Sequence, residues 1–233
     1  MSETDPNAAR LAVAQRVFAR VHAEHGEHLI AAAVYGSVAR AEASAESDVE
    51  LTIITDETVE YADAYCFEQG ILVEYTMVPA ARMLAASRRV TPAWGIEADQ
   101  YRRHLVLWDP TGFFPTLWRA ARDIPDGAFA EAAHTAWWHA FEGRGKYHNA
   151  ARMGDLPRIH YTAWQFAYMT ALRIALHERR PYTSGRTIWT DVVVRGYGMS
   201  GLLAALTAGS VDHISAAIEL VWAETQLWGK PEQ

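Results

Sequence analysis

The sequence predicts an α+β fold, with a mixed sheet and helices over residues 1–124 and an all-helical domain over 125–233. Short apolar runs bounded by Gly, Asp and Pro fill the first part, and such runs are typical of strands joined by turns. Past Pro125 the period changes. Two long stretches rich in alanine and aromatic residues, 129–152 and 157–179, follow the spacing of helices. The length of 233 residues accommodates two modest domains of this kind.

The first elements have clear sequence boundaries. Apolar positions recur at helical spacing over 7–25, and Gly26 is a natural stop. The run 29–35 is short and apolar and ends at Gly36-Ser37, which predicts a buried strand followed by a tight turn. Residues 38–45 are rich in alanine and predict a helix.

The same patterns predict the remaining elements. Alternation over 49–55 predicts a strand, and the β-like runs 61–67 and 71–78 on either side of Gln69-Gly70 predict a hairpin. The other expected elements are a helix at 80–87, a strand at 104–108, and helices at 188–194 and 210–228.

Composition limits the kinds of binding partner and the cellular compartment that we expect. The formal net charge is −7 and no large cluster of Lys and Arg occurs, so we expect neither nucleic acid nor a membrane as a partner. Excess acid suits a cationic ligand, or carboxylates gathered around metal ions. The single cysteine, Cys66, cannot form an internal disulfide, and no signal-like or membrane-length apolar run is present. We therefore expect a cytoplasmic protein.

The turn Gly36-Ser37, followed by Arg40, has the chemistry of a phosphate site. Glycine lets the backbone approach a ligand, and a serine hydroxyl with free helix N–H groups suits phosphate oxygens. Arg40 adds a charge that can bind phosphate in bidentate fashion. The alternative is a simple helix start with Ser37 as its N-cap.

Three acidic residues follow in strand contexts. Asp48 and Glu50 are two residues apart, so on a strand they project from one face. Glu74 is a lone acid in the β-like run 71–78. If the two strands are neighbours the acids converge, and three carboxylates suit magnesium. The alternative is a solvated sheet face, which the apolar neighbours of Glu50 disfavour.

In this order, the Gly-Ser turn, the Asp-x-Glu strand and the later acid resemble the nucleotidyltransferase superfamily that includes DNA polymerase β. The resemblance implies a small mixed sheet in which the turn holds a triphosphate and the acids bind two magnesium ions. The residues to which these roles carry over are Gly36, Ser37 and Arg40 for the phosphates, and Asp48, Glu50 and Glu74 for the metal.

The helical part carries a second motif. Glu142 and Lys146 are four residues apart on an expected helix, which by itself indicates a surface ion pair worth about 0.3–0.5 kcal/mol. Two glycines, Gly143 and Gly145, lie in the same stretch although each costs a helix about 1 kcal/mol relative to alanine. The stretch 141–150 resembles the Glu-x-x-Gly-Lys-x-x-Asn segment of the kanamycin nucleotidyltransferase family, whose members adenylylate the 4′-hydroxyl of aminoglycosides.

This closer resemblance implies an antibiotic-resistance enzyme that moves AMP from ATP to an aminoglycoside. Glu142 would then be the general base, and Lys146 would bind the nucleotide and neutralise charge on the α-phosphate. Thr183 and Ser184, in a segment similar to the family's, would be further phosphate contacts. The resemblance also implies a homodimer whose sites lie at the subunit interface.

Two other segments have the composition of binding sites. Trp94, Glu97 and Asp99 fall in an expected loop and form a candidate grip for a cationic acceptor. Residues 196–201 match the pattern G-x-G-x-x-G, but no strand with an acid follows about 20 residues later, so we interpret them as a turn between helices.

Other functions fit the motifs less well. The acceptor could be another small antibiotic, such as a lincosamide, or a partner protein adenylylated by an antitoxin-type enzyme. The long helical part disfavours the protein-modifying class, whose domains are commonly shorter. A regulatory module without catalysis is disfavoured because all three acids are present.

Overall fold

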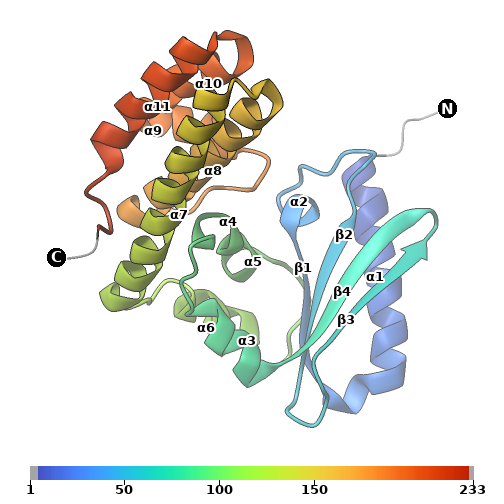
Figure 1. Ribbon diagram of the computed structural model, residues 1–233. Coiled ribbons are helices and arrows are strands. Elements are labelled where there is room, and N and C mark those ends of the chain that lie inside the picture. Colours follow the sequence, from blue (N-terminus) through green and yellow to red (C-terminus); the bar gives the residue numbers. More distant parts are fainter. Residues whose placement is uncertain (1–4, 231–233) are drawn as a thin grey trace. The chain divides into compact units, whose positions relative to one another are not determined.

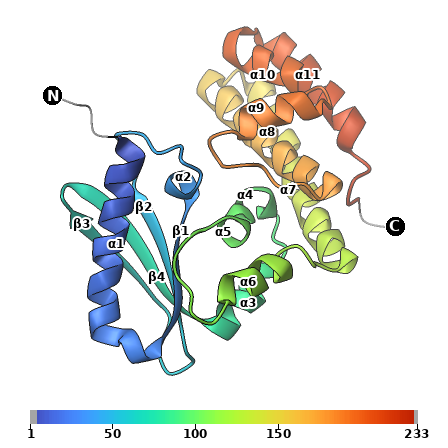
Figure 2. The same cartoon turned by 180° about the vertical axis from the view of Figure 1, so that it is seen from behind.

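The computed structural model describes residues 5–230, which divide into two compact units (Figures 1 and 2). We call them the sheet unit, which runs to Arg89 and includes Ala98–Ile124, and the helical unit, which comprises Val90–Glu97 and the chain from Pro125 onward. The sequence placed 90–97 in the first domain. This segment belongs instead to the helical unit because the Trp94 ring packs edge-to-face on Phe129, at 4.9 Å between centroids.

The sheet unit contains five strands and short helices around one long helix. Its elements are α1 (Pro6–His25), η1 (Gly26–His28), β1 (Leu29–Tyr35), α2 (Gly36–Ala39), β2 (Val49–Thr55), β3 (Ala62–Glu68), β4 (Ile71–Pro79), α3 (Ala80–Ser87), α5 (Asp99–Arg102), β5 (Leu105–Trp108) and α6 (Phe113–Ala120). The strand order is β3-β4-β2-β1-β5. Only β2 and β4 pair in parallel, and the other neighbours are antiparallel, so the sheet is mixed as predicted.

Local signals explain where these elements begin and turn. Asp5 caps α1 by accepting the Asn7 N–H at 3.0 Å, and Pro6 suits the first helical position. The β3–β4 hairpin turns at Gln69 and Gly70, which both have positive φ (54° and 77°). This is the backbone that two-residue hairpin turns require.

The two faces of the sheet are covered differently, as the views from both sides show (Figures 1 and 2). Helix α1 covers one face with an apolar stripe that includes Val13, Val17 and Val21. On the other face, α3 and α6 pack over Ala31, Ala33, Ile54 and Val78. Glu50 and Glu74 lie on this second face, outside the apolar residues that pack beneath α1 and beneath α3 and α6.

The helical unit is built on two long neighbouring helices. Its elements are α4 (Trp94–Glu97), α7 (Asp126–Met153), α8 (Leu156–Glu178), α9 (Ile188–Arg195), α10 (Met199–Ala208) and α11 (Val211–Thr225). The central α8 is buried along most of its length and contributes Phe166, Ile174 and Leu176 to the core. Arg173 is also buried and donates to the Thr225 and Trp228 carbonyls at 2.6 and 3.1 Å, which anchors the end of α11.

Three expectations about secondary structure need correction. The helix expected over 38–45 ends at Ala39, because Ala41 adopts a positive φ of 59° and the chain turns away. The expected loop around Trp94 and Asp99 contains the short helices α4 and α5. Helix α6 was missed, although Asp109 caps it by accepting the Phe113 and Phe114 N–H groups at 2.8 and 3.0 Å. The turn expected at 196–201 is confirmed for Gly196–Gly198, after which α10 begins.

Within residues 5–230, no helix is long and apolar enough to cross a membrane.

A pH-dependent interaction lies inside the sheet unit. The Nδ1 atom of His104 accepts the Trp118 indole N–H at 3.1 Å, and burial lowers the pKa of this imidazole to about 4. The folded state therefore resists protonation, whereas the unfolded chain takes up the proton near pH 6.5. Stability that is fully present above pH 6.5 is lost as the pH falls toward 4.

We expect wild-type protein to lose about 2 kcal/mol more unfolding free energy between pH 7.5 and 5 than His104→Asn, whose amide oxygen takes the position of Nδ1 and can still accept from Trp118. Urea unfolding at the two pH values measures the difference. Equal losses in both proteins would show that His104 does not stay neutral in the fold.

Candidate active site

Strand register brings the predicted acids to one face of the sheet. Glu50 on β2 is the pairing partner of Glu74 on β4 and of Tyr35 on β1, and Tyr65 on β3 pairs with Glu74. These four residues therefore form a row across the sheet, which we call the carboxylate row. Asp48 lies two residues before Glu50, directly ahead of β2. Neighbouring strands are about 4.8 Å apart, so Glu50 and Glu74 are close enough to share a cation.

Electrostatics reflect the proximity of these charges. Burial raises the pKa of Glu50, and the charges of Asp48 and Glu74 raise it further, while Arg40 opposes them. Burial also raises the pKa of Tyr35, and the charges of Glu50, Glu74 and Asp48 add to that effect. Tyr35 is thus a protonated phenol beside the acids. Among the described residues, 5–230, no three His, Cys, Asp or Glu side chains are gathered tightly enough to form a metal-binding cluster as they stand.

Gly36 is the residue of the Gly-Ser turn that lies against the Glu50 carboxylate of the carboxylate row. Its φ is +69°, and a Cβ built there would lie 1.5 Å from Oε2 of Glu50. Only glycine leaves room for the carboxylate to lie against the turn. Ser37 is the second residue of α2, and Tyr35 occupies the N-cap, so the alternative interpretation of Ser37 as an N-cap is wrong.

Arg40 has carboxylate partners in the structure. Its side chain is 8% exposed, with Nε 2.9 Å from Glu42 Oε2 and Nη1 2.5 Å from Asp99 Oδ2. Asp99, expected as an open grip for a cationic acceptor, is thus an ion-pair partner that links α5 to the turn. A phosphate that binds Arg40 has to replace or share these partners.

Arg10 is a supporting residue that the sequence analysis missed. It is 5% exposed, and its guanidinium donates at 2.5 Å to the carbonyl oxygens of both Ala45 and Ser47. These bonds from α1 hold the loop that delivers Asp48 to β2. An arginine inside the otherwise apolar stripe of a helix is the signal that indicates such a buried role. Tyr35 was also missed, although its place directly before Gly36 is evident in the sequence.

Glu142 and Lys146 lie on α7 in the helical unit. Their side chains form an ion pair at 2.9 Å and remain 63% and 51% exposed. Together with His139, Gly143, Gln165 and Met169 they line a cavity of about 170 Å³. The pair therefore borders a hollow while both charged groups stay accessible.

The other candidates of the helical unit differ in accessibility. Thr183 is exposed, whereas Ser184 is buried and its hydroxyl accepts the Thr187 N–H at 3.3 Å in the turn before α9. Trp94 is 3% exposed, so its ring is not available to grip a cationic acceptor as predicted. Glu97 is exposed and accepts the Thr91 hydroxyl at 2.5 Å.

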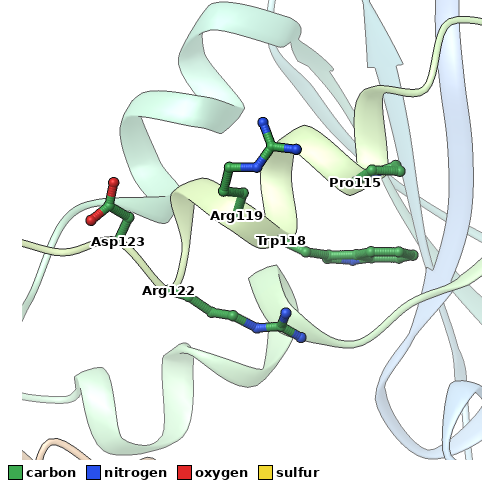
Figure 3. A pocket seen from close by; sticks show the side chains of 5 residues that line it. All are labelled: Pro115, Trp118, Arg119, Arg122 and Asp123. Carbon is green, nitrogen blue, oxygen red and sulfur yellow. The ribbon is translucent and has the colours of Figure 1, made fainter.

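A larger hollow of about 480 Å³ lies beside α6 (Figure 3). Its lining consists of Pro115, Trp118, Arg119, Arg122 and Asp123. None of the residues predicted to bind metal, nucleotide or acceptor takes part, and a single carboxylate does not provide a metal site. The carboxylate row therefore remains the candidate active site.

The mixed sheet, the Gly-Ser turn and the carboxylate row, followed by a helical unit, define a nucleotidyltransferase. Residues 111–233 match the family model described as the KNTase C-terminal domain, and the chain belongs to this family.

Known proteins similar to this chain agree with that class. An aminoglycoside nucleotidyltransferase (4′) from Staphylococcus aureus is 22% identical over 227 residues, which cover 94% of this chain and 89% of the relative. A protein of the same name from a Bacillus species has the same identity and coverage. A crystal structure of a nucleotidyltransferase-like protein from Exiguobacterium sibiricum shares the fold, with a TM-score of 0.58 and 13% identity over 91% of this chain and 74% of that one. The chain is accordingly a nucleotidyltransferase enzyme.

The Gly36–Glu50 contact is testable by adding one methyl group. We expect Gly36→Ala to reduce nucleotidyl transfer at least tenfold, because the new Cβ displaces the Glu50 carboxylate. Gly70→Ala is the matched control, since Gly70 also has a positive φ (77°) but a Cβ added there would meet nothing within 4 Å. Both variants should lose a similar 1–2 kcal/mol of stability, roughly the cost of alanine in a left-handed conformation.

Transfer rates and urea unfolding of the two variants separate strain from contact. Equal activity of Gly36→Ala and Gly70→Ala would show that the position of Glu50 against the turn is unimportant.

Proposed function

We propose that the enzyme transfers AMP from ATP to a hydroxyl of an aminoglycoside, the 4′-hydroxyl first among them, and releases pyrophosphate with Mg²⁺ as cofactor. The carboxylate row beside the Gly36 turn is the observation that carries this proposal. The names of the two curated relatives support the acceptor and its position. The net charge of −7 suits a polycationic acceptor.

The residues that would hold Mg²⁺ are Asp48, Glu50 and Glu74. Their donor chemistry fits the ion, since all three offer carboxylate oxygens, and burial together with the charges of Asp48 and Glu74 raises the pKa of Glu50. Bound Mg²⁺ would polarise the triphosphate and lower the pKa of the acceptor hydroxyl. The protein contributes a fixed face for these acids, because the β2–β4 register sets Glu50 beside Glu74.

The nucleotide contacts follow from the turn and from the helical unit. Backbone at Gly36 and the Ser37 hydroxyl would bind phosphate oxygens, with Arg40 as a nearby charge. From the helical unit, Lys146 would neutralise charge that develops on the α-phosphate. Thr183 is the more accessible of the two further phosphate contacts, and Ser184 would have to give up its bond to Thr187.

Glu142 is proposed as the general base. Its exposed carboxylate can accept the proton of the acceptor hydroxyl, while Lys146 offsets the charge that develops on the phosphate. The 2.9 Å ion pair keeps the two side chains together. We also propose that the enzyme works as a homodimer in which Glu142 and Lys146 complete a site at the interface. This assembly rests on the resemblance to the kanamycin nucleotidyltransferase family.

Purified protein with Mg²⁺, ATP and a panel of aminoglycosides should release pyrophosphate only when drug is present. Glu142→Gln should lower the rate by about a hundredfold or more, the typical contribution of a general base. Glu131→Gln is the matched control, since Glu131 is an exposed acid on the same helix. EDTA should abolish release in every protein.

The outcomes divide the proposal into parts. Release with acceptors that lack a 4′-hydroxyl would move the modification to another position. Equal rates for Glu142→Gln and Glu131→Gln would remove Glu142 as the base but keep the function. If no aminoglycoside stimulates release, the acceptor assignment is wrong.

A further inference from the structure

A cavity of about 210 Å³ opens on the carboxylate face of the sheet unit. Its floor contains Thr52 and Thr76, which are register partners on β2 and β4. Tyr35, Tyr61 and Arg82 are among its walls. None of the roles assigned above uses Thr52, Thr76, Tyr61 or Arg82.

The cavity shares Tyr35 with the carboxylate row and lies on the same face of β2 and β4. Thr52 lies two residues after Glu50, and Thr76 two residues after Glu74, so each pair shares one face of its strand. Two residues along a strand span roughly 7 Å, which is the scale of one sugar ring. Tyr35 belongs to both the row and the cavity. A ring held over the threonines therefore lies within reach of the acids.

Asp63 is not a lining residue, but it bonds two residues that line the cavity and so sets their hydrogen-bonding character. Its Oδ2 accepts the Tyr61 hydroxyl at 2.6 Å, and its Oδ1 accepts the Thr76 hydroxyl at 2.8 Å. Both hydroxyl hydrogens are thus directed to Asp63, and the two oxygens are left as acceptors for a ligand that donates. The exposed carboxylate adds a negative charge at the same edge.

Arg82 contributes a positive charge to the lining of the cavity. Its guanidinium lies 3.9 Å from the centre of the Tyr61 ring, in a cation–π arrangement. This charge repels an ammonium group and can donate to hydroxyl oxygens, as can the Gln100 amide. The cavity therefore offers acceptor oxygens at Tyr61 and Thr76, beside the charge of Asp63, and donor groups at Arg82 and Gln100.

We infer that this cavity is an acceptor subsite that holds one amino-sugar ring, with its ammonium group toward Asp63 and its hydroxyls toward Arg82. The inference rests on the proposed function and specifies where the acceptor binds. At about 210 Å³ the cavity suits a single ring and is smaller than the 300 Å³ or more typical of whole-ligand sites. Bound there, a ring presents a hydroxyl to the carboxylate row.

Asp63→Asn tests the subsite because it removes the charge while keeping the size of the side chain. We expect the KM for the aminoglycoside to rise about tenfold or more, as for loss of a charge-assisted hydrogen bond, with the KM for ATP unchanged. Glu60→Gln, an exposed acid just before β3, is the matched control and should leave both constants unchanged. An acceptor whose amino group on the bound ring is replaced by hydroxyl should lose its dependence on Asp63.

A rise in the KM for ATP alone would assign the cavity to the nucleotide, and unchanged constants would overturn the inference. Calorimetric binding of the aminoglycoside without nucleotide separates the two proposals. If wild-type protein binds drug without turnover and Asp63→Asn weakens that binding, the function is wrong but the subsite stands. If wild-type protein neither binds nor modifies any aminoglycoside, both are wrong.

Discussion

The parallel pairing of β2 with β4 places Glu50 directly beside Glu74, so the sheet unit has to hold two like charges side by side. Burial raises the pKa of Glu50 in the same sense as its acidic neighbours, so the site is built against the intrinsic preference of the carboxylates. Arg40 offsets part of this repulsion, and its own charge is shared with Asp99 and Glu42. A site of this kind favours binding of cations, whether metal ions or an ammonium group.

Gly36 and Arg10 help to hold the acids in place, although neither is an acid of the candidate site. The absence of a side chain at Gly36 lets Glu50 lie against the turn, where a Cβ would overlap its Oε2 atom. Arg10 reaches from α1 to the carbonyls of Ala45 and Ser47 and thereby fixes the irregular loop before Asp48. The Gly36 turn and the acids of the candidate site are thus positioned by residues that are close in space and remote in sequence.

Hydrophobic periodicity was sufficient to predict every long helix and strand, because burial of one face imposes a repeat that is visible in the sequence. Periodicity was not sufficient to predict segments whose backbone conformation depends on contacts with residues distant in the sequence. The alanine-rich segment after Val38 has high helix propensity, yet its carbonyls at Ala45 and Ser47 bond to Arg10 and the chain turns at Ala41. The three acids were identified from strand spacing, whereas Tyr35 and Asp63 join them only through cross-strand register, which no single segment encodes.

Gly143 and Gly145 lie beside Glu142 on α7, and the space around them shows whether packing requires glycine there. A Cβ at Gly143 would meet Phe166 at 3.8 Å, an ordinary packing distance, and one at Gly145 would meet no described atom within 4 Å. Alanine thus fits both positions and would favour the helix by about 1 kcal/mol each. Packing inside the helical unit therefore does not account for either glycine. Close approach of a substrate or a partner backbone to this stretch of α7 would account for them, as the catalytic role proposed for Glu142 and Lys146 requires.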